Sequence, residues 1–203
     1  MLHHPYTQVK FLTSAARVSQ LPADVGFEVA FAGRSNAGKS SALNCLTGKR
    51  QLARTSKTPG RTQLINLFSI NDEKRLVDLP GYGYAKVPMA TKLNWQQELA
   101  LYLETRQCLR GLVLLMDSRH PLKEQDQLMI EWASDRELPL HILLTKADKL
   151  SRSQGMLTLK QVRDAMALHA YVSVQLFSSQ SKLGLEELVK VMNGWYAPSE
   201  PRP

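Results

Sequence analysis

The segment GRSNAGKS, at positions 33–40, fits the pattern G-x-x-x-x-G-K-[ST]. In such a loop the glycines let backbone N–H groups turn toward a polyphosphate, and the helix that starts at the lysine adds the positive end of its dipole. Lys39 would then reach the β- and γ-phosphates of a nucleotide, and the Ser40 hydroxyl would bind Mg²⁺. The alternative is a glycine-rich turn without a ligand, which the predicted strand–loop–helix setting disfavours.

A second motif, DLPG at positions 78–81, follows the lysine of this phosphate loop by about 40 residues and comes directly after a predicted strand. The Asp78 carboxylate would face the phosphate loop across the sheet and hold Mg²⁺ through water. The N–H group of Gly81 would contact a γ-phosphate. A D-x-x-G motif alone is weak evidence for a nucleotide site. Its position at the end of a strand, about 40 residues after the phosphate loop, makes the evidence strong.

Two further motifs predict recognition of guanine. In TKAD, at positions 145–148, the Asp148 carboxylate can accept both the ring N–H and the exocyclic amine of guanine. Adenine lacks this pair of donors, so such an aspartate rejects ATP, while the Lys146 stem packs on the base. In FSSQSKLG, at positions 177–184, the N–H groups around Ser178 and Ser179 would meet the guanine carbonyl oxygen.

Strands and helices alternate around these motifs, and each motif follows a predicted strand. This order predicts a doubly wound α/β domain of three layers, with six mostly parallel strands, one antiparallel edge hairpin and helices on both faces. Ligands of such sheets bind beyond the carboxyl ends of the strands. The strands are expected at 25–33, 62–70, 74–80, 111–117, from 140 and at 171–179, and the helices at 39–47, near 95–103, at 122–136, near 159–166 and near 185–192.

The composition suits one globular domain: the chain has 203 residues, of which 43% are hydrophobic and 22% charged. We expect an N-terminal extension at 1–22 packed on the domain, the domain itself at 23–196, and a flexible Pro-rich tail at 197–203. No run of 18 apolar residues and no secretory signal is present, so a membrane protein is not expected. The two cysteines form no disulfide framework, and a cytoplasmic location is expected.

The formal net charge is +8, and the excess is uneven. Five cations and no acid lie in residues 49–61, which predicts a mobile loop that meets an anionic partner. A merely solvated loop is the alternative. The five histidines show no metal-ligand spacing, so no zinc site is predicted.

The motifs GRSNAGKSS, KTPGRTQLIN, DLPGYGYA, TKADK and FSSQSKLG together resemble the EngB family (also called YihA or YsxC) of small Ras-like GTPases of translation-factor class. The resemblance covers roughly 18–195. It implies a P-loop NTPase of the Ras-like G-domain type that hydrolyses GTP to GDP and phosphate with Mg²⁺. It also implies a nucleotide-gated switch in assembly of the large ribosomal subunit, with the subunit or its rRNA as partner, needed for normal cell division and septation. A monomer is expected. Thr145 replaces the commoner Asn of the base-reading motif, as in other EngB-like chains, so guanine selection is expected to survive.

The resemblance also assigns residues to the site. Thr62 would complete the Mg²⁺ site when GTP is bound, and Thr58 is the alternative from spacing alone. The expected catalytic residues are Lys39, Thr62 and Gly81, and the expected metal ligands are Ser40, Thr62 and, through water, Asp78. The residues expected to bind the nucleotide are Gly33, Arg34, Ser35, Asn36, Ala37, Gly38, Lys39, Ser40, Ser41, Gly60, Arg61, Thr62, Gln63, Leu64, Asp78, Leu79, Pro80, Gly81, Thr145, Lys146, Ala147, Asp148, Phe177, Ser178 and Ser179.

Hydrolysis is expected to be slow without help. Many GTPases orient the attacking water with a glutamine after the D-x-x-G motif, and this chain has Tyr82, which carries no amide. Some GTPases of similar sequence use an Asn at the place of Asn36 to ligate K⁺ beside the phosphates. The alternative is that Asn36 only turns or caps the loop. Residues 82–88, with tyrosines expected on the surface, would move with the γ-phosphate, as would residues 49–61.

Two other functions stay open from the residues. One is a module that binds GTP and GDP with negligible hydrolysis. The other is a P-loop kinase of small molecules, which would need an arginine-rich lid and an acceptor pocket and would leave TKAD without a role.

Overall fold

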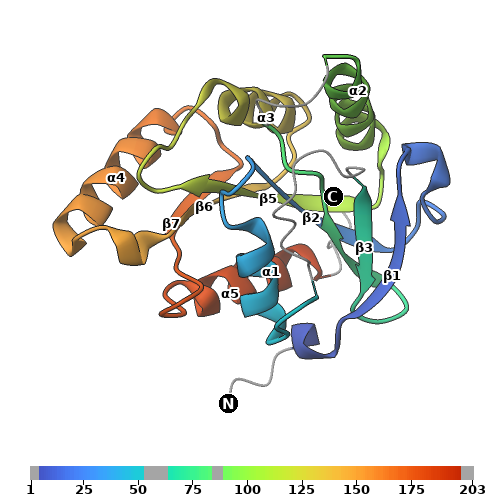
Figure 1. Ribbon diagram of the computed structural model, residues 1–203, viewed down its shortest axis with the longest axis horizontal. Coiled ribbons are helices and arrows are strands. Elements are labelled where there is room, and N and C mark those ends of the chain that lie inside the picture. The colour runs from blue at the N-terminus through green and yellow to red at the C-terminus, as the bar shows by residue number, and fades with distance from the viewer. Residues whose placement is uncertain (1–4, 53–63, 84–88, 198–203) are drawn as a thin grey trace, which may run out of the picture.

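A seven-stranded sheet with the strand order β1-β3-β4-β2-β5-β6-β7 forms the centre of the molecule (Figure 1). The computed structural model describes the backbone of residues 5–52, 64–83 and 89–197, and their side chains except those of 89–96. The strands are β1 (Lys10–Ala15), β2 (Phe27–Gly33), β3 (Ile65–Ser69), β4 (Lys74–Asp78), β5 (Leu109–Asp117), β6 (Leu140–Thr145) and β7 (Val172–Leu176).

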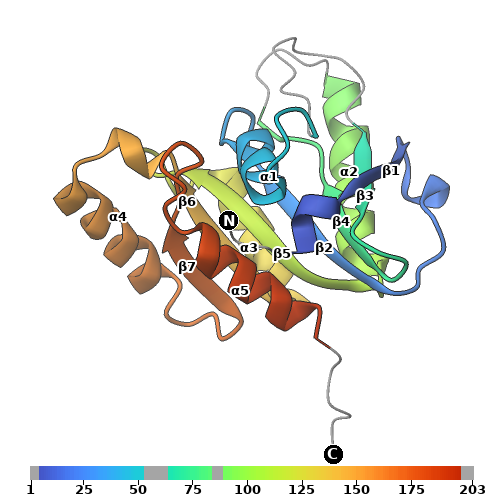
Figure 2. The ribbon, with the colours of Figure 1, turned by 90° about the horizontal axis from the view of Figure 1, so that it is seen from below.

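Helices cover both faces of the sheet, as the sequence predicts (Figure 2). On one face α2, α3 and α4 bury residues such as Tyr102 and Met129, and on the other α1 and α5 bury residues such as Leu43 and Leu188. The helices are α1 (Lys39–Thr47), α2 (Met89–Thr105), α3 (Glu124–Asp135), α4 (Arg152–Ala165) and α5 (Leu185–Trp195), with short 3-10 helices at Pro5–Gln8, Val18–Gln20 and Ala147–Lys149. None of the helices in the described ranges is long and apolar enough to cross a membrane.

The apolar run of β5 shows why the sheet lies between two layers. Leu112 and Leu114 point into the core under α2 and α3, while Val113 and Leu115 point into the core under α1 and α5. Successive side chains of a strand alternate between faces, so a strand covered on both sides must be apolar at nearly every position. The strands β2, β4, β5, β6 and β7 pair in parallel, so their carboxyl ends meet at one edge.

The prediction of six strands is wrong by one. Residues 10–15 form β1, which pairs antiparallel with β3 and lies outside the β3–β4 hairpin, so this hairpin is not at the edge of the sheet. The segment was hard to predict because Phe11 and Leu12 are 61% and 46% exposed, and an irregular register between Phe11 and Thr13 breaks the alternation. The predicted division of the chain at residues 22/23 and 196/197 stays a prediction.

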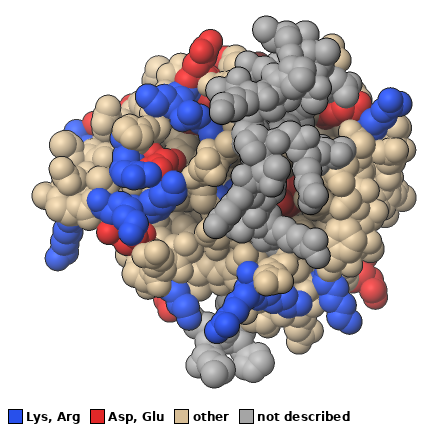
Figure 3. Space-filling model, in the orientation of Figure 1, with Lys and Arg blue, Asp and Glu red and all other residues tan. Residues whose placement is uncertain are grey.

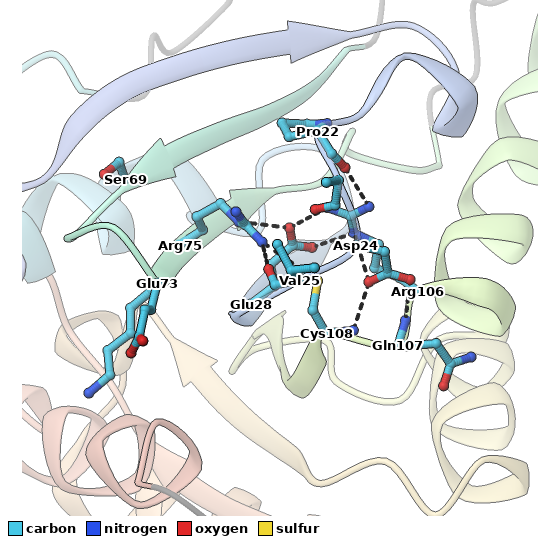
Figure 4. Close-up of polar contacts among 12 residues, drawn as sticks. Pro22, Asp24, Val25, Glu28, Ser69, Glu73, Arg75, Arg106, Gln107 and Cys108 are labelled. Atoms are coloured by element: carbon cyan, nitrogen blue, oxygen red, sulfur yellow. Dashed lines mark hydrogen bonds and ion pairs between the residues drawn. The ribbon is translucent and has the colours of Figure 1, made fainter.

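A buried ion cluster fixes the amino end of β2 (Figure 4). The Glu28 side chain has no exposed surface, and its Oε1 accepts hydrogen bonds from Arg75 Nε at 3.0 Å and Arg106 Nη2 at 2.7 Å. Its Oε2 accepts from Arg106 Nε at 3.0 Å and from the Tyr102 hydroxyl at 2.9 Å. Each carboxylate oxygen therefore has two donors, and a single side chain joins β2, β4 and the end of α2. The phosphate loop begins at the other end of the same strand.

Candidate nucleotide-binding site

The phosphate loop connects β2 to α1, and its backbone has the turns that the sequence predicts. Asn36 and Gly38 have φ angles of 63° and 94°, in the left-handed region that glycine and asparagine adopt most readily. Helix α1 begins at Lys39, directly after this turn. The amino end of α1 and the N–H groups of the loop therefore form the kind of concave, positive site that binds phosphate.

Asp78 lies beside the phosphate loop, although it is distant in sequence. It ends β4, which pairs in parallel with β2, and its carboxylate forms an ion pair with the ammonium group of Lys39. Both side chains are nearly buried, at 12% exposed for Lys39 and 10% for Asp78. The structure thus brings together the lysine of the first motif and the aspartate of the second. Ser40 is the next residue of α1, and hydroxyl and carboxylate oxygens are donors that suit Mg²⁺.

Tyr82 is buried, which corrects the expectation that the tyrosines after DLPG are on the surface. It is 3% exposed and packs in the core under α2 and α3, and its hydroxyl donates a hydrogen bond to Asp126 Oδ1 at 2.8 Å. Burial raises the pKa of Tyr82, so this hydroxyl stays protonated at neutral pH. Tyr84 lies outside the described residues. The start of the segment after DLPG is therefore anchored on the first turn of α3.

The base-reading loop, residues 145–148, contacts the phosphate loop through two side chains. The Thr145 hydroxyl lies 2.5 Å from the carbonyl oxygen of Ala37 and 3.0 Å from that of Met116, so its single proton is shared between the two acceptors. The Lys146 ammonium donates to the carbonyl oxygen of Asn36 at 2.7 Å. Thr145 replaces the commoner Asn in this motif, and its hydroxyl supplies a direct bond between the two loops.

Asp148 is held by the next loop of the sheet edge. The Ser178 hydroxyl donates to Asp148 Oδ1 at 2.6 Å, and the Ala147 N–H donates to the carbonyl oxygen of Phe177 at 3.2 Å. The hydrogen bond from Ser178 lowers the pKa of Asp148, so the carboxylate is ionised at neutral pH and can only accept hydrogen bonds. The loops that follow β6 and β7 are therefore joined by these two hydrogen bonds.

Asp117 and Arg119, which lie outside the sequence motifs, belong to this edge too. The Asp117 carboxylate accepts from Lys146 Nζ at 2.9 Å and from Arg119 Nη2 at 2.6 Å. The bonds from Arg119 and Lys146 hold the pKa of Asp117 well below its usual range. Asp117 thus orients the lysine of the base-reading loop, as its place at the end of β5 suggests.

Several residues predicted to bind the nucleotide lie outside the described residues or bury their side chains. Gly60, Arg61, Thr62 and Gln63, together with the alternative Thr58, lie in the range 53–63, outside the described residues. Leu64 precedes β3 and is partly buried. The side chains of Leu79 and Phe177 pack in the two cores, so these two positions can offer only their backbone to a ligand.

Comparison with known proteins identifies the family. A family model described as "50S ribosome-binding GTPase" matches residues 28–146, which is more than half of the chain. The "Probable GTP-binding protein EngB" of Enterobacter sp. (strain 638) is 58% identical over 202 residues, covering 99% of this chain and 97% of that protein. The chain belongs to the EngB family. As a member of this P-loop GTPase family it binds GTP and hydrolyses it, which confirms the fold class and the activity that the motifs predict.

Solved structures agree with the fold of this EngB chain. The crystal structure of "a probable GTP-binding protein engB" has a TM-score of 0.67 at 20% identity and covers 83% of this chain and 98% of that one. The structure of Era in complex with MgGDPNP and a segment of 16S ribosomal RNA has a TM-score of 0.64 at 20% identity, covering 88% of this chain and 59% of that one. At these identities the likeness shows the P-loop GTPase fold alone.

Proposed function

We propose that this EngB GTPase is a nucleotide-gated switch that binds the large ribosomal subunit, through its rRNA, during assembly of the subunit. The observation that carries the proposal is the match of residues 28–146 to a family described as 50S ribosome-binding. The net charge of +8 agrees with an anionic partner. The protein would act in the cytoplasm. Effects on cell division and septation would be secondary to defective ribosome assembly.

Cations on the edge that carries the site support an RNA partner. Figure 3 shows Lys and Arg side chains gathered on the left of this face and along its lower edge. Arg119 and Lys123 follow β5, Lys149 and Arg152 follow β6, and Lys182 follows β7, and all five are exposed. Each phosphate that a cation neutralises releases counterions, so such a group of side chains favours RNA binding that weakens as salt rises.

The nucleotide would lie across the carboxyl edge of the sheet. We assign its phosphates to residues 33–41, with Lys39 as the main positive charge, and its guanine to residues 145–148 and 177–179. Mg²⁺ would be held by Ser40, by Thr62 and, through water, by Asp78. The support is the ion pair of Lys39 with Asp78, the hydrogen bond of Ser178 to Asp148, and the contact of Thr145 with Ala37, which join these segments.

Hydrolysis would depend on position and charge. Lys39 would neutralise charge that develops on the γ-phosphoryl group, the Gly81 N–H would contact it, and Thr62 would order with it. When bound, Mg²⁺ supplies Lewis-acid stabilisation of the phosphoryl oxygens. The Tyr82 side chain is directed into the core and bonded to Asp126, so it does not orient the attacking water. We therefore expect slow intrinsic turnover that a partner or a cation raises.

Asn36 gives a test of the cation. Its φ of 63° fits a turn residue, its side chain is exposed, and no described residue forms a hydrogen bond with that side chain. If the side chain ligates K⁺ beside the phosphates, single-turnover hydrolysis is expected to run about tenfold faster in K⁺ than in Na⁺, a step of about 1.4 kcal/mol in the barrier. Asn36→Ala should remove the difference. Equal rates of the wild type in the two salts would leave Asn36 as a turn residue only.

Co-sedimentation tests the switch. Large ribosomal subunits should retain the protein with a non-hydrolysable GTP analogue and lose most of it with GDP, because the γ-phosphate would order the basic segment before Thr62. Lys39→Ala, which removes the positive charge assigned to the phosphates, should be retained by the subunits equally little with the GTP analogue and with GDP. Binding that ignores the nucleotide, or no binding at all, would refute the switch.

Two assays address the alternatives. Phosphate release that subunits do not accelerate, from a protein with almost no intrinsic rate, would favour a module that only binds GTP and GDP. ATP that displaces bound GDP as well as GTP does would favour a small-molecule kinase.

A further inference from the structure

The phosphate loop contains a buried hydroxyl group, that of Ser35. Its oxygen is inaccessible to solvent, and it has no hydrogen-bond partner in the part of the chain that the structure describes. Hydroxyl groups in protein interiors nearly always have a partner, since leaving one unpaired is costly. The other buried, unpaired side-chain atoms among the described residues are Ser118 Oγ and Arg110 Nε, and the Arg110 guanidinium stacks on the Phe27 ring at 4.9 Å.

Ser35 lies where the phosphate loop meets the DLPG segment. Its N–H donates to the carbonyl oxygen of Tyr82 at 2.8 Å, and the N–H of Tyr82 donates to the carbonyl oxygen of Gly33 at 3.3 Å. A Cβ atom on Gly81 would lie 3.6 Å from the Ser35 nitrogen and 3.7 Å from its Cα, so the two backbones leave room for little more than one carbon atom between them. Ser35 therefore lies next to the glycine whose N–H is assigned to the γ-phosphate.

The chemistry left to Ser35 is that of its side chain. The backbone N–H is already paired with Tyr82, so it cannot bind phosphate as other N–H groups of the loop would. A hydroxyl can donate one hydrogen bond, and a phosphoryl oxygen is a strong acceptor. A buried donor next to a phosphate forms a stronger bond than one in water, because the surroundings screen it less.

We propose that the Ser35 hydroxyl donates a hydrogen bond to the γ-phosphoryl group of GTP and so contributes both to the preference for GTP over GDP and to hydrolysis. The proposal rests on the nucleotide placement given above. In GDP the hydroxyl has no phosphoryl partner. In GTP it gains one, and the bond strengthens as charge moves onto the γ-phosphoryl oxygens in the transition state. The pattern G-x-x-x-x-G-K-[ST] allows any residue at position 35, so this role would depend on the serine side chain of this particular chain.

Ser35→Ala tests the proposal, with Ser118→Ala as the matched control. The control removes the other buried, unpaired hydroxyl, at the end of β5. Affinities for GDP and for a non-hydrolysable GTP analogue are measured by fluorescence, and hydrolysis is followed in single turnovers. Ser35→Ala should keep the affinity for GDP within about twofold, weaken that for the analogue about tenfold and slow hydrolysis about tenfold, the loss expected for one charge-assisted hydrogen bond. Ser118→Ala should keep the wild-type ratio of the two affinities.

The outcomes separate the possible failures. Equal loss of affinity for GDP and for the analogue in Ser35→Ala would mean a structural role and would overturn the proposal. A wild-type ratio and a wild-type rate in Ser35→Ala would overturn it as well. A crystal structure of the wild-type protein in which the nucleotide does not contact the phosphate loop would refute the nucleotide placement itself, independently of any variant.

Discussion

Asp148→Asn is expected to weaken binding of GTP and GDP at least about a hundredfold and to make the protein prefer xanthosine nucleotides. Guanine would give two hydrogen bonds to the carboxylate, and bonds to a charged group contribute about 1.5–3 kcal/mol each. An amide in place of the carboxylate puts an N–H group against the guanine amine. Xanthine has a carbonyl oxygen where guanine has that amine, so the new amide can donate to it.

Competition against a fluorescent GDP measures this change in specificity. In the wild type, GTP and GDP should displace the fluorescent GDP and ATP should not. For Asp148→Asn the probe is a fluorescent xanthosine nucleotide, and xanthosine diphosphate should displace it at lower concentration than GDP does. Asp164→Asn is a suitable control, since this exposed carboxylate of α4 pairs only with Lys160 among the described residues and should change no nucleotide affinity. An unchanged GDP affinity in Asp148→Asn would contradict the assignment of the guanine subsite.

Glu28→Gln is expected to lower the free energy of unfolding by about 3–5 kcal/mol, the loss typical of removing one partner from a buried ion cluster. The substitution keeps the shape of the side chain and removes its charge. Arg75 and Arg106 are only 8% and 5% exposed, so both guanidinium groups would stay in the interior after the carboxylate of Glu28 is lost. Arg106 would keep the longer ion pair with Asp24, at 3.7 Å, while Arg75 would keep no ion pair among the described residues. The Gln side chain also offers one acceptor oxygen in place of two, which leaves the Tyr102 hydroxyl or an Arg N–H unpaired.

Urea unfolding followed by circular dichroism measures the loss. The midpoint of Glu28→Gln should fall strongly, while Asp164→Asn, in the exposed pair on α4, should leave the midpoint nearly unchanged because surface ion pairs contribute little. Below the unfolding transition, Glu28→Gln should still bind GDP, since Glu28 lies about 16 Å along β2 from the phosphate loop. A midpoint equal to that of the wild type would show that the cluster is not a main source of stability.

The sequence predicts the phosphate loop, α1 and the covered strands much better than the outer parts of the fold. The phosphate loop and α1 have the predicted bounds, since a glycine pattern before a helix depends on local backbone geometry. The covered strands β5 and β6 are evident from apolar runs. The edge strand β1 is not, because a strand with one exposed face, an irregular register and exposed Phe11 and Leu12 carries no clear alternation.

Contacts between distant residues explain the other differences. Tyr82 lies between two glycines, which suggests a surface loop. Its burial depends on packing in the core under α2 and α3 and on the bond of its hydroxyl to Asp126, 44 residues away. Glu28 stands in an apolar strand, and its partners Arg75 and Arg106 are 47 and 78 residues away. The contact of Thr145 with Ala37 spans 108 residues. No local pattern indicates such pairs, since each depends on the order of strands in the finished sheet.

A crystal structure of the protein with Mg²⁺ and a non-hydrolysable GTP analogue tests the central claim most directly. One nucleotide should bridge the sheet edge, with the guanine N–H groups on the Asp148 carboxylate and the β- and γ-phosphates on Lys39 and the N–H groups of residues 33–40. A nucleotide whose phosphates occupy the phosphate loop while its base lies away from Asp148 would contradict the account.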